Sequence, residues 1–220
     1  VQCYNMLFCR NDIFEEYNLK VPETWDDFYN VLKKLQKGGM QTSIGDTQLL
    51  YETFLLQNGG ELYEDDLSST EMTSEKSVTA FHEVTEFFTR WGVPVSADAL
   101  NRFRTGQIPM LISTAYFYNS LTISATEIEG LWSMYPIPAT VNNDSSSNRS
   151  ESGKVSGAIA FKSSKNVDET FDFLNWWTSD EVQNEFAFEC ESRIGKGSRY
   201  FPANKNVLKT MSWSEEEYVA

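Results

Sequence analysis

Apolar residues recur at helical spacing in the segment that follows Pro22. The stripe consists of Phe28, Val31, Leu32 and Leu35, at i, i+3, i+4 and i+7. Thr24 is a good N-cap residue, and Asp26 and Asp27 fall in the first turn, where the helix dipole favours carboxylates. The pair Gly38 and Gly39 follows the last apolar position and can end the helix. The pattern predicts a well-capped amphipathic helix between Thr24 and Gly38.

Short apolar runs alternate with further helical segments along the rest of the chain. We expect strands at 4–9, 42–44, 109–112, 132–135 and 155–161. We expect helices at 12–17, 47–57, after Ser74, at 96–103, from Tyr116, after Asn166, at 179–191 and from Ser214. Short strands between longer helices predict an α/β fold in which helix exceeds strand.

For some of these segments the sequence also predicts which residues are buried or cap a helix. The helix after Ser74 is expected to bury one apolar stripe made of Val78, Phe81, Val84, Phe88 and Trp91, with the single histidine, His82, packed in the core. Asn166 and Glu169 have the spacing of a capping box. The helix that they begin is expected to turn Phe171, Leu174 and Trp177 inward. Residues 142–153 are almost entirely Asn, Ser and Asp, which predicts an exposed loop or linker.

Composition indicates an acidic globular protein. The chain has 220 residues, of which 40% are apolar, and 18 Lys and Arg stand against 32 Asp and Glu, giving a net charge of −14. That sign argues against a nucleic-acid or anionic-membrane surface, because both need clustered cations. The alternative meaning of the charge is solubility alone. No window approaches the ~18 apolar residues of a membrane span. No signal peptide is visible, and the start at Val1 reads as a piece of something longer.

Catalytic and metal chemistry have little support in the sequence. The three cysteines, Cys3, Cys9 and Cys190, show no disulfide or zinc spacing, and Cys9 and Cys190 are expected to fill the core. No Ser/His/Asp or Cys/His set is evident, and the isolated glycine pairs are not a phosphate-binding fingerprint. We expect no cofactor and no metal.

Six segments, in order, resemble one known family. They are residues 4–17 with DIFEE at 12–16, PETWDDF at 22–28, FLLQNGG at 54–60 with Tyr63 and Asp65, FRTG with PMLI at 103–112, WSMYPIP at 132–138, and SSKN at 163–166 with FLNWWTSDEVQ at 173–183. The family is the sugar-binding, maltose-binding-protein-like extracellular solute-binding proteins of ABC importers. The resemblance implies a periplasmic-binding-protein-like type II lobe that is helix-rich around a short central sheet.

The same resemblance implies how the chain is divided. Residues 1–153 correspond to the C-terminal lobe, residues 154–190 to a segment that crosses into the N-terminal lobe, and residues 191–220 to a return to the C-terminal lobe. The N-terminal lobe is then incomplete, and the 220 residues alone are expected to fold but to bind ligand weakly.

Tyr116 and Tyr118 are the first candidate ligand residues. Flat aromatic faces stack on sugar rings, and ligands of open α/β folds lie beyond the carboxyl ends of strands. Both tyrosines directly follow the expected strand at 109–112, and Tyr116 matches the place of a stacking tryptophan in the family. The alternative is that both are ordinary core or surface aromatics.

Two further segments resemble ligand-contacting positions of the family. Asp46, Gln48 and Tyr51 open a helix, where free N–H groups and side chains can meet sugar hydroxyls, although Asp46 is at least as well explained as a helix cap. Ser156 and Gly157 stand at the second crossing between lobes, where glycine permits either a close approach to ligand or a tight crossing.

The resemblance favours a receptor that binds an oligosaccharide or related solute without catalysis. It implies ABC permease subunits as partners, a monomer, no nucleic-acid partner, and an extracellular, lipid-anchored location. Two alternatives remain at this stage. A glycoside hydrolase needs only paired carboxylates, which this acidic chain supplies in abundance, and a surface protein that binds glycans without transport would need no lobe closure.

Overall fold

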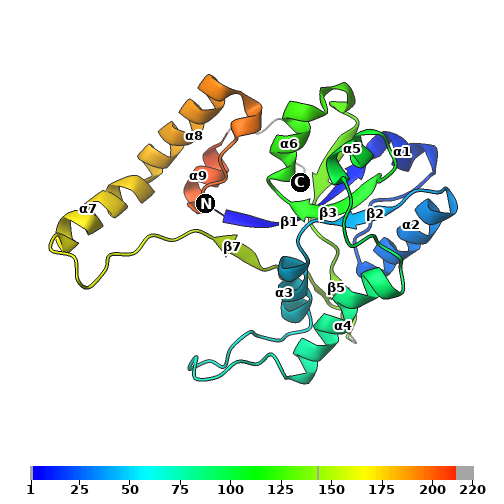
Figure 1. The fold of residues 1–220 in the computed structure, drawn as a ribbon, viewed down its shortest axis with the longest axis horizontal. Helices are drawn as coiled ribbons and strands as arrows, with labels where there is room; N and C mark the ends of the chain where they lie inside the picture. The colour runs from blue at the N-terminus through cyan, green and yellow to red at the C-terminus, as the bar shows by residue number, and fades with distance from the viewer. Residues whose placement is uncertain (1, 143, 212–220) are drawn as a thin grey trace.

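The computed structural model describes residues 2–142 and 144–211, and its centre is a five-stranded sheet (Figure 1). The strand order is β2 (Thr42–Ile44), β3 (Met110–Thr114), β1 (Gln2–Arg10) and β4 (Trp132–Tyr135), with β7 (Gly153–Val155) paired to the first residues of β1. β1 is antiparallel to β3, β4 and β7, and β2 is parallel to β3. The other four strands therefore all end toward the edge where β1 begins.

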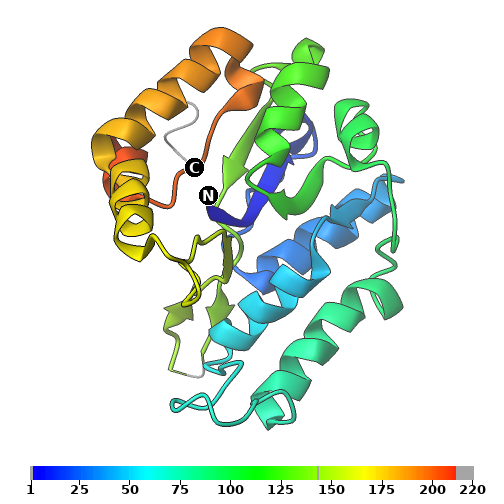
Figure 2. The ribbon, with the colours of Figure 1, turned by 60° about the vertical axis from the view of Figure 1, so that its left-hand side comes forward.

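Helices cover both faces of this sheet (Figures 1 and 2). The helices are α1 (Asn11–Glu16), α2 (Trp25–Lys37), α3 (Thr47–Gln57), α4 (Glu75–Thr89), α5 (Ala99–Arg104), α6 (Phe117–Ser124), α7 (Val167–Thr178), α8 (Asp180–Ile194) and α9 (Lys205–Thr210), with short 3-10 turns η1 (Thr126–Ile128) and η2 (Lys196–Ser198). A small hairpin pairs β5 (Thr140–Val141) with β6 (Ser147–Asn148). The architecture is the helix-rich α/β fold that the sequence predicts.

Two apolar clusters lie on opposite faces of β1, because successive strand side chains point to opposite sides. Leu7 and Cys9 pack with α2, α3 and α4, whereas Met6 and Phe8 pack with α5 and α6. Cys9 is fully buried, as expected for a core filler.

Trp25 lies at the centre of the first cluster. Its ring contacts those of Phe28, Phe54 and Phe87 at centroid distances of 5.7, 4.5 and 6.1 Å. Its indole N–H donates to Gln57 Oε1 at 2.8 Å. The predicted start of this helix is confirmed, since Thr24 and Asp27 form a reciprocal capping box.

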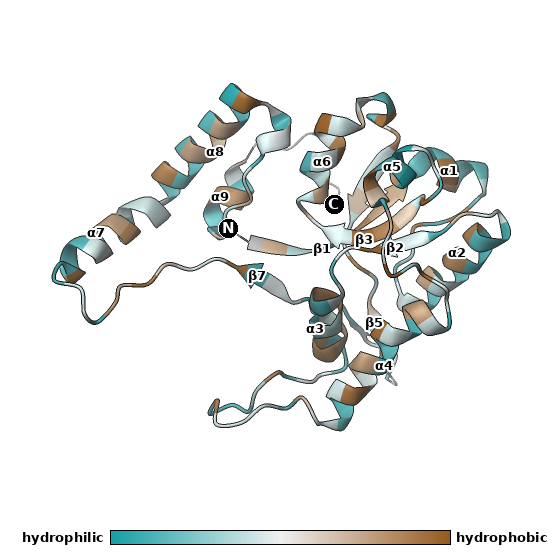
Figure 3. Cartoon of the chain, in the orientation of Figure 1, coloured by the Kyte–Doolittle hydropathy of each residue, from teal (hydrophilic) through white to brown (hydrophobic). Residues whose placement is uncertain are grey.

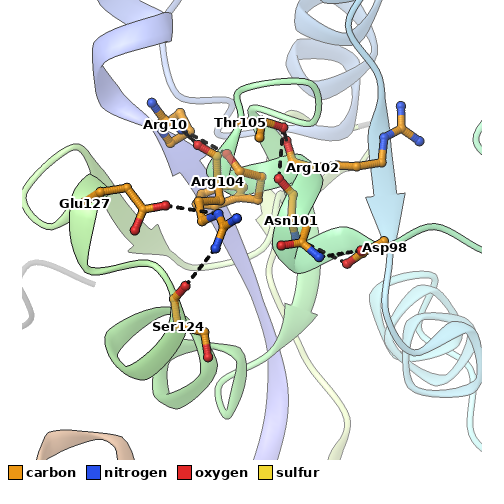
Figure 4. A network of polar contacts seen from close by, with 9 residues as sticks. Arg10, Asp98, Asn101, Arg102, Arg104, Thr105, Ser124 and Glu127 are labelled. Carbon is orange, nitrogen blue, oxygen red and sulfur yellow. Dashed lines mark hydrogen bonds and ion pairs between the residues drawn. The ribbon is translucent and has the colours of Figure 1, made fainter.

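Arg10 ties the far end of β1 to α5 (Figure 4). Its guanidinium is nearly buried and forms an ion pair with Asp12 at 2.7 Å. It also donates to the carbonyl oxygens of Phe103 and Arg104, each at 2.9 Å. Arg104 in turn pairs with Glu127 at 3.0 Å, so one network holds β1, α5 and η1 together.

Replacing Arg10 with methionine is expected to lower the free energy of unfolding by about 3 kcal/mol. The methionine fills space, but it leaves two carbonyl oxygens and the Asp12 carboxylate without their donor. Urea unfolding followed by circular dichroism measures the loss. Arg90→Met is the matched control, because Arg90 forms only an exposed ion pair with Glu86 and should change stability by less than about 1 kcal/mol. Equal losses in the two variants would contradict the structural role of Arg10.

The predicted buried face of α4 is wrong by part of a turn. Ser74 caps the helix as expected, but the buried residues are Ser77, Ala80, Val84 and Phe87. Phe81 is 60% exposed, and His82 is exposed rather than packed in the core. Helix α4 carries apolar residues on several sides, so the sequence pattern alone does not identify its buried face. Its contact with α3 determines which face is buried.

The predictions around the segment from 142 to 178 also need correction. Residues 142–153 are not simply a loop, because Asn148 on β6 donates to the carbonyls of Leu56 and Gln57 at 3.2 and 2.9 Å. The strand expected at 155–161 stops at Val155, since within the described chain no strand pairs with 156–161. Asn166 makes no side-chain cap, and α7 has no fully buried residue.

The helix expected from Ser214 lies outside the described residues. Among the described residues, no helix is long and apolar enough to cross a membrane.

Candidate functional site

Three strands deliver candidate residues to one edge of the sheet. β2, β3 and β7 end at Ile44, Thr114 and Val155, all toward the start of β1. The N–H of Ala115 donates to the carbonyl of Tyr4 at 3.0 Å, which fixes the end of β3 against the start of β1. We call this region the carboxyl edge. Asp46, Tyr116 and Ser156 each lie two or fewer residues beyond a strand end here.

Asp46 both caps α3 and joins it to β7. One carboxylate oxygen accepts from the N–H of Leu49 at 2.9 Å, and the other pairs with Lys154 Nζ at 2.6 Å. Partial burial opposes ionisation, but the hydrogen bonds from Lys154 and Leu49 outweigh it and lower the pKa of Asp46. The Asp46 carboxylate is therefore held ionised at the carboxyl edge. Its role as the N-cap of α3 agrees with the alternative interpretation made from the sequence.

Gln48 and Tyr51, near the start of α3, have side chains in different environments. Gln48 is exposed and donates to Glu52 Oε1 at 3.0 Å. The hydroxyl of Tyr51 is engaged with Ser77 Oγ of α4 at 2.6 Å, and its ring packs against the core. The hydroxyl and ring of Tyr51 are thus engaged in the α3–α4 contact, a correction to its selection from sequence.

Tyr116 and Tyr118 are also separated by the geometry of the helix. Tyr116 is half-buried at the start of α6, where its ring meets that of Phe201 at 5.2 Å and nearly a right angle. Partial burial, followed by the neighbouring Cys3 and Tyr200, raises its pKa. Tyr118 is only 3% exposed. The structure places it in the core, as the alternative interpretation held.

Tyr118 faces the interior on the far side of α6. Its ring contacts Trp132 at 5.9 Å, and the Arg199 guanidinium lies 5.4 Å from its centroid. It lines a small cavity of about 80 Å³ together with Trp132 and Lys196. The Tyr118 side chain is therefore part of the core beside this cavity, a correction to its selection from sequence.

Ser156 and Gly157 are exposed immediately after β7. A Cβ added at Gly157 would meet no atom within 4 Å, so packing in this structure does not require glycine there. Both residues lie where the chain leaves the body toward α7 (Figure 1).

A second polar group at the carboxyl edge escaped the sequence analysis. Glu151 has a buried carboxylate oxygen, Oε1, and Asn5 on β1 has a fully buried side chain. Neither Glu151 Oε1 nor the Asn5 side-chain amide has a hydrogen-bond partner among the described residues. Burial raises the pKa of Glu151 to about 8, although the backbone N–H of Asn5 opposes the shift. The polar composition of 142–153 suggested exposure and concealed this group.

The carboxyl edge offers an aromatic ring, a fixed ion pair and exposed polar backbone. Within the described parts of the chain, no three His, Cys, Asp or Glu side chains are placed to hold a metal ion. Such a mixture is typical of pockets that hold polar organic molecules.

A family model decides the classification. The model of bacterial extracellular solute-binding proteins matches residues 1–184. This chain belongs to that family. The members are binding proteins and not enzymes, so the glycoside hydrolase alternative is set aside.

Solved structures share the fold of this solute-binding chain. The sugar-binding protein MalE of Xanthomonas citri is 17% identical with a TM-score of 0.72, covering 95% of this chain and 53% of that one. The GacH receptor of Streptomyces glaucescens is 16% identical with a TM-score of 0.67, covering 100% and 55%. A solute-binding protein of an ABC transporter from Thermotoga lettingae, bound with α-D-tagatose, is 19% identical with a TM-score of 0.65, covering 94% and 54%.

These three comparisons concern only part of each neighbour. The solute-binding chain spans about half the length of the solved structures that it matches. No curated protein matches it.

Proposed function

We propose that this chain forms one lobe of an extracellular receptor that captures a sugar, an oligosaccharide in particular, for an ABC importer. The observation that carries the proposal is the carboxyl edge, where the ends of β2, β3 and β7 gather Asp46, Tyr116 and Ser156. An aromatic ring beside fixed hydrogen-bonding groups is the usual composition of a sugar site. We assign the ligand wall to Asp46, Gln48, Tyr116, Ser156 and Gly157.

The arm from β7 to α8 supports a two-lobe arrangement. It carries large apolar side chains that are exposed, including Ile159 (73%), Phe161 (70%), Phe173 (57%), Trp176 (55%) and Phe188 (70%). Brown, hydrophobic stretches recur along this arm in Figure 3. A surface of this kind marks a contact with another body. We propose that residues 154–190 pack against a second lobe, while residues 1–153 and 191–220 form the lobe described here.

Closure of two lobes on the ligand would then present the closed form to membrane-bound permease subunits. The same proposal places the receptor outside the cell as a lipid-anchored monomer. Its support is the family assignment and the sugar-binding neighbours named above.

A thermal-shift screen with mono- and oligosaccharides tests the proposal on the 220-residue chain and on the full product of its gene. A ligand that binds only the folded state stabilises it by about 2.7 kcal/mol at a hundredfold excess over Kd. We expect one glycan class to raise the unfolding temperature of the full gene product clearly. The rise should be smaller for the 220-residue chain, because this chain forms only one wall of the proposed cleft. No shift in either form with any glycan would refute the sugar assignment.

Substitution of Tyr116 identifies the site within the same assay. Tyr116→Ala is expected to weaken sugar binding by at least about tenfold, since base- or ring-stacking contacts of this size contribute about 1–3 kcal/mol. Tyr116→Phe keeps the ring and should stay within a few-fold of the wild type. Tyr17→Ala is the matched control, because Tyr17 is 42% exposed beyond the opposite end of β1. Equal binding by Tyr116→Ala and wild type would remove Tyr116 from the site.

A further inference from the structure

A groove of about 430 Å³ lies between α3, the segment 61–67 and Ser152. Its floor is apolar, formed by Leu55, Leu56 and Leu62, and its rim carries carboxylates. The rim residues are Glu52, Glu61, Glu64 and Asp65. We call it the acidic groove. The loop that walls it lies below α3 and beside α4 in Figure 1.

The wall of the acidic groove is an ordered hairpin and not a loose loop. Tyr63 and Thr70 form an antiparallel bridge. The N–H of Glu71 donates to the carbonyl of Leu62 at 3.0 Å, and the N–H of Glu64 donates to Ser69 at 3.1 Å. The groove therefore has a fixed shape before any partner arrives.

At the tip of this hairpin, Leu67 has an unfavourable backbone conformation. Leu67 has a φ of +58°, in the left-handed region that costs a bulky residue conformational free energy and costs glycine almost none. Its side chain is also 75% exposed and lines the groove. Neither its backbone nor its exposure helps folding, and such outliers concentrate at functional sites.

Ion pairs do not neutralise the charge of the rim. No ion pair joins Glu52, Glu61, Glu64 or Asp65 to a lysine or arginine within residues 2–142 and 144–211. Glu61 also lies just past the C-terminus of α3, whose last turn has no basic residue and where the helix dipole disfavours carboxylates. The rim thus maintains a negative potential next to an apolar floor.

We propose that the acidic groove binds a basic, amphipathic segment of a partner polypeptide. Leucine and aromatic side chains on one face of such a segment would fill the floor and contact Leu67, and its lysines or arginines would pair with the rim. A second copy of this chain is a poor occupant, since the net charge is −14 and like charges would meet. A metal ion is also a poor occupant, because the described residues place no group of three ligands together.

The test uses the 220-residue chain and a labelled synthetic peptide of about 14 residues, with leucines at helical spacing and lysines on the other face. Fluorescence anisotropy measures its Kd. We expect binding that weakens as salt rises from about 50 to about 300 mM, because exposed ion pairs are screened. A scrambled peptide of the same composition, which lacks the apolar face, is expected to bind at least about tenfold more weakly.

Two sets of variants separate the groove from the overall charge. Neutralising the rim with Glu61→Gln, Glu64→Gln and Asp65→Asn is expected to weaken peptide binding at least about tenfold. The matched control changes the net charge equally with Glu15→Gln, Glu16→Gln and Glu23→Gln, which are exposed and do not line the groove, and it should change Kd less than about twofold. Equal losses from the two triple variants would overturn the proposal, because net charge alone would then explain binding.

Leu67→Gly separates binding from stability. Glycine suits the positive φ, so the variant should unfold at an equal or higher temperature than the wild type. Loss of the side chain should nevertheless weaken peptide binding about fivefold. Unchanged binding by Leu67→Gly, or no difference between the amphipathic and scrambled peptides, would overturn the proposal.

Discussion

Replacement of Trp25 by alanine is expected to lower the free energy of unfolding by about 3–5 kcal/mol, the range for removing a large buried aromatic side chain. Trp25 is 7% exposed, and its ring packs against Phe28, Phe54 and Phe87. Its loss would also leave Gln57 Oε1 without the indole donor, although Thr140 would still donate to that oxygen at 2.8 Å. Urea unfolding followed by circular dichroism in the far ultraviolet, where helices such as those of this fold absorb, gives the measurement.

Two further variants make the Trp25 result specific. Trp25→Phe keeps most of the ring packing and loses the hydrogen bond, so a loss of about 1–2 kcal/mol is expected. Trp176→Ala removes the same side chain from α7, where it is 55% exposed, and should cost less than about 1 kcal/mol. If Trp25→Ala were no more destabilising than Trp176→Ala, the aromatic cluster would not be the centre of the fold.

Replacement of Glu151 by glutamine is expected to stabilise the protein at high pH and to change little at low pH. The folded pKa of Glu151 is raised to about 8, whereas an unfolded glutamate titrates near 4.3. Below about pH 4 the carboxyl is protonated in both states and has no effect on stability. Between about pH 4 and 8 unfolding releases a proton, so the stability of the wild type falls as pH rises. Above about pH 8 the carboxylate is ionised in both states, so the wild type is destabilised by the full free energy of burying the charge.

Glutamine has the shape of the protonated carboxyl and cannot ionise. The difference in unfolding free energy between Glu151→Gln and wild type should therefore grow from near zero at pH 4 to about 2–4 kcal/mol at pH 9. Other groups titrate over the same range, but they cancel in this difference. Glu16→Gln, at an exposed position on α1, should give a flat difference. A flat difference for Glu151→Gln as well would show that its carboxyl is hydrated.

Glu151 also bears on the carboxyl edge, because it lies two residues before the strand that pairs with the start of β1. Asn5 lies on β1 and Glu151 lies just before β7, so their unpaired polar atoms are beside the strand pair from which the chain continues to α7. The ionisation of Glu151 should therefore affect the stability of the segments that we propose to link the two lobes.

The sequence by itself determined the elements whose evidence is local. The helix from Trp25 was predictable because Thr24, Asp27 and a single apolar stripe act within a few residues of one another. Ser74 and Asp46 cap their helices for the same reason. The order of six short motifs also sufficed for the family, since it depends on residue identity and not on where side chains point.

Tertiary structure decided every question of direction and burial. Tyr51 and Tyr118 are separated from Gln48 and Tyr116 because their helices turn them against α4 and Trp132. The buried face of α4 follows from its contact with α3, since the helix offers apolar residues on several sides. The Glu151 carboxylate is partly buried beside Asn5, which is distant in sequence, and no local pattern of serines and asparagines could indicate this. Local hydrogen bonds and periodicity can be determined from neighbouring residues, whereas side-chain burial depends on which surfaces the whole fold brings together.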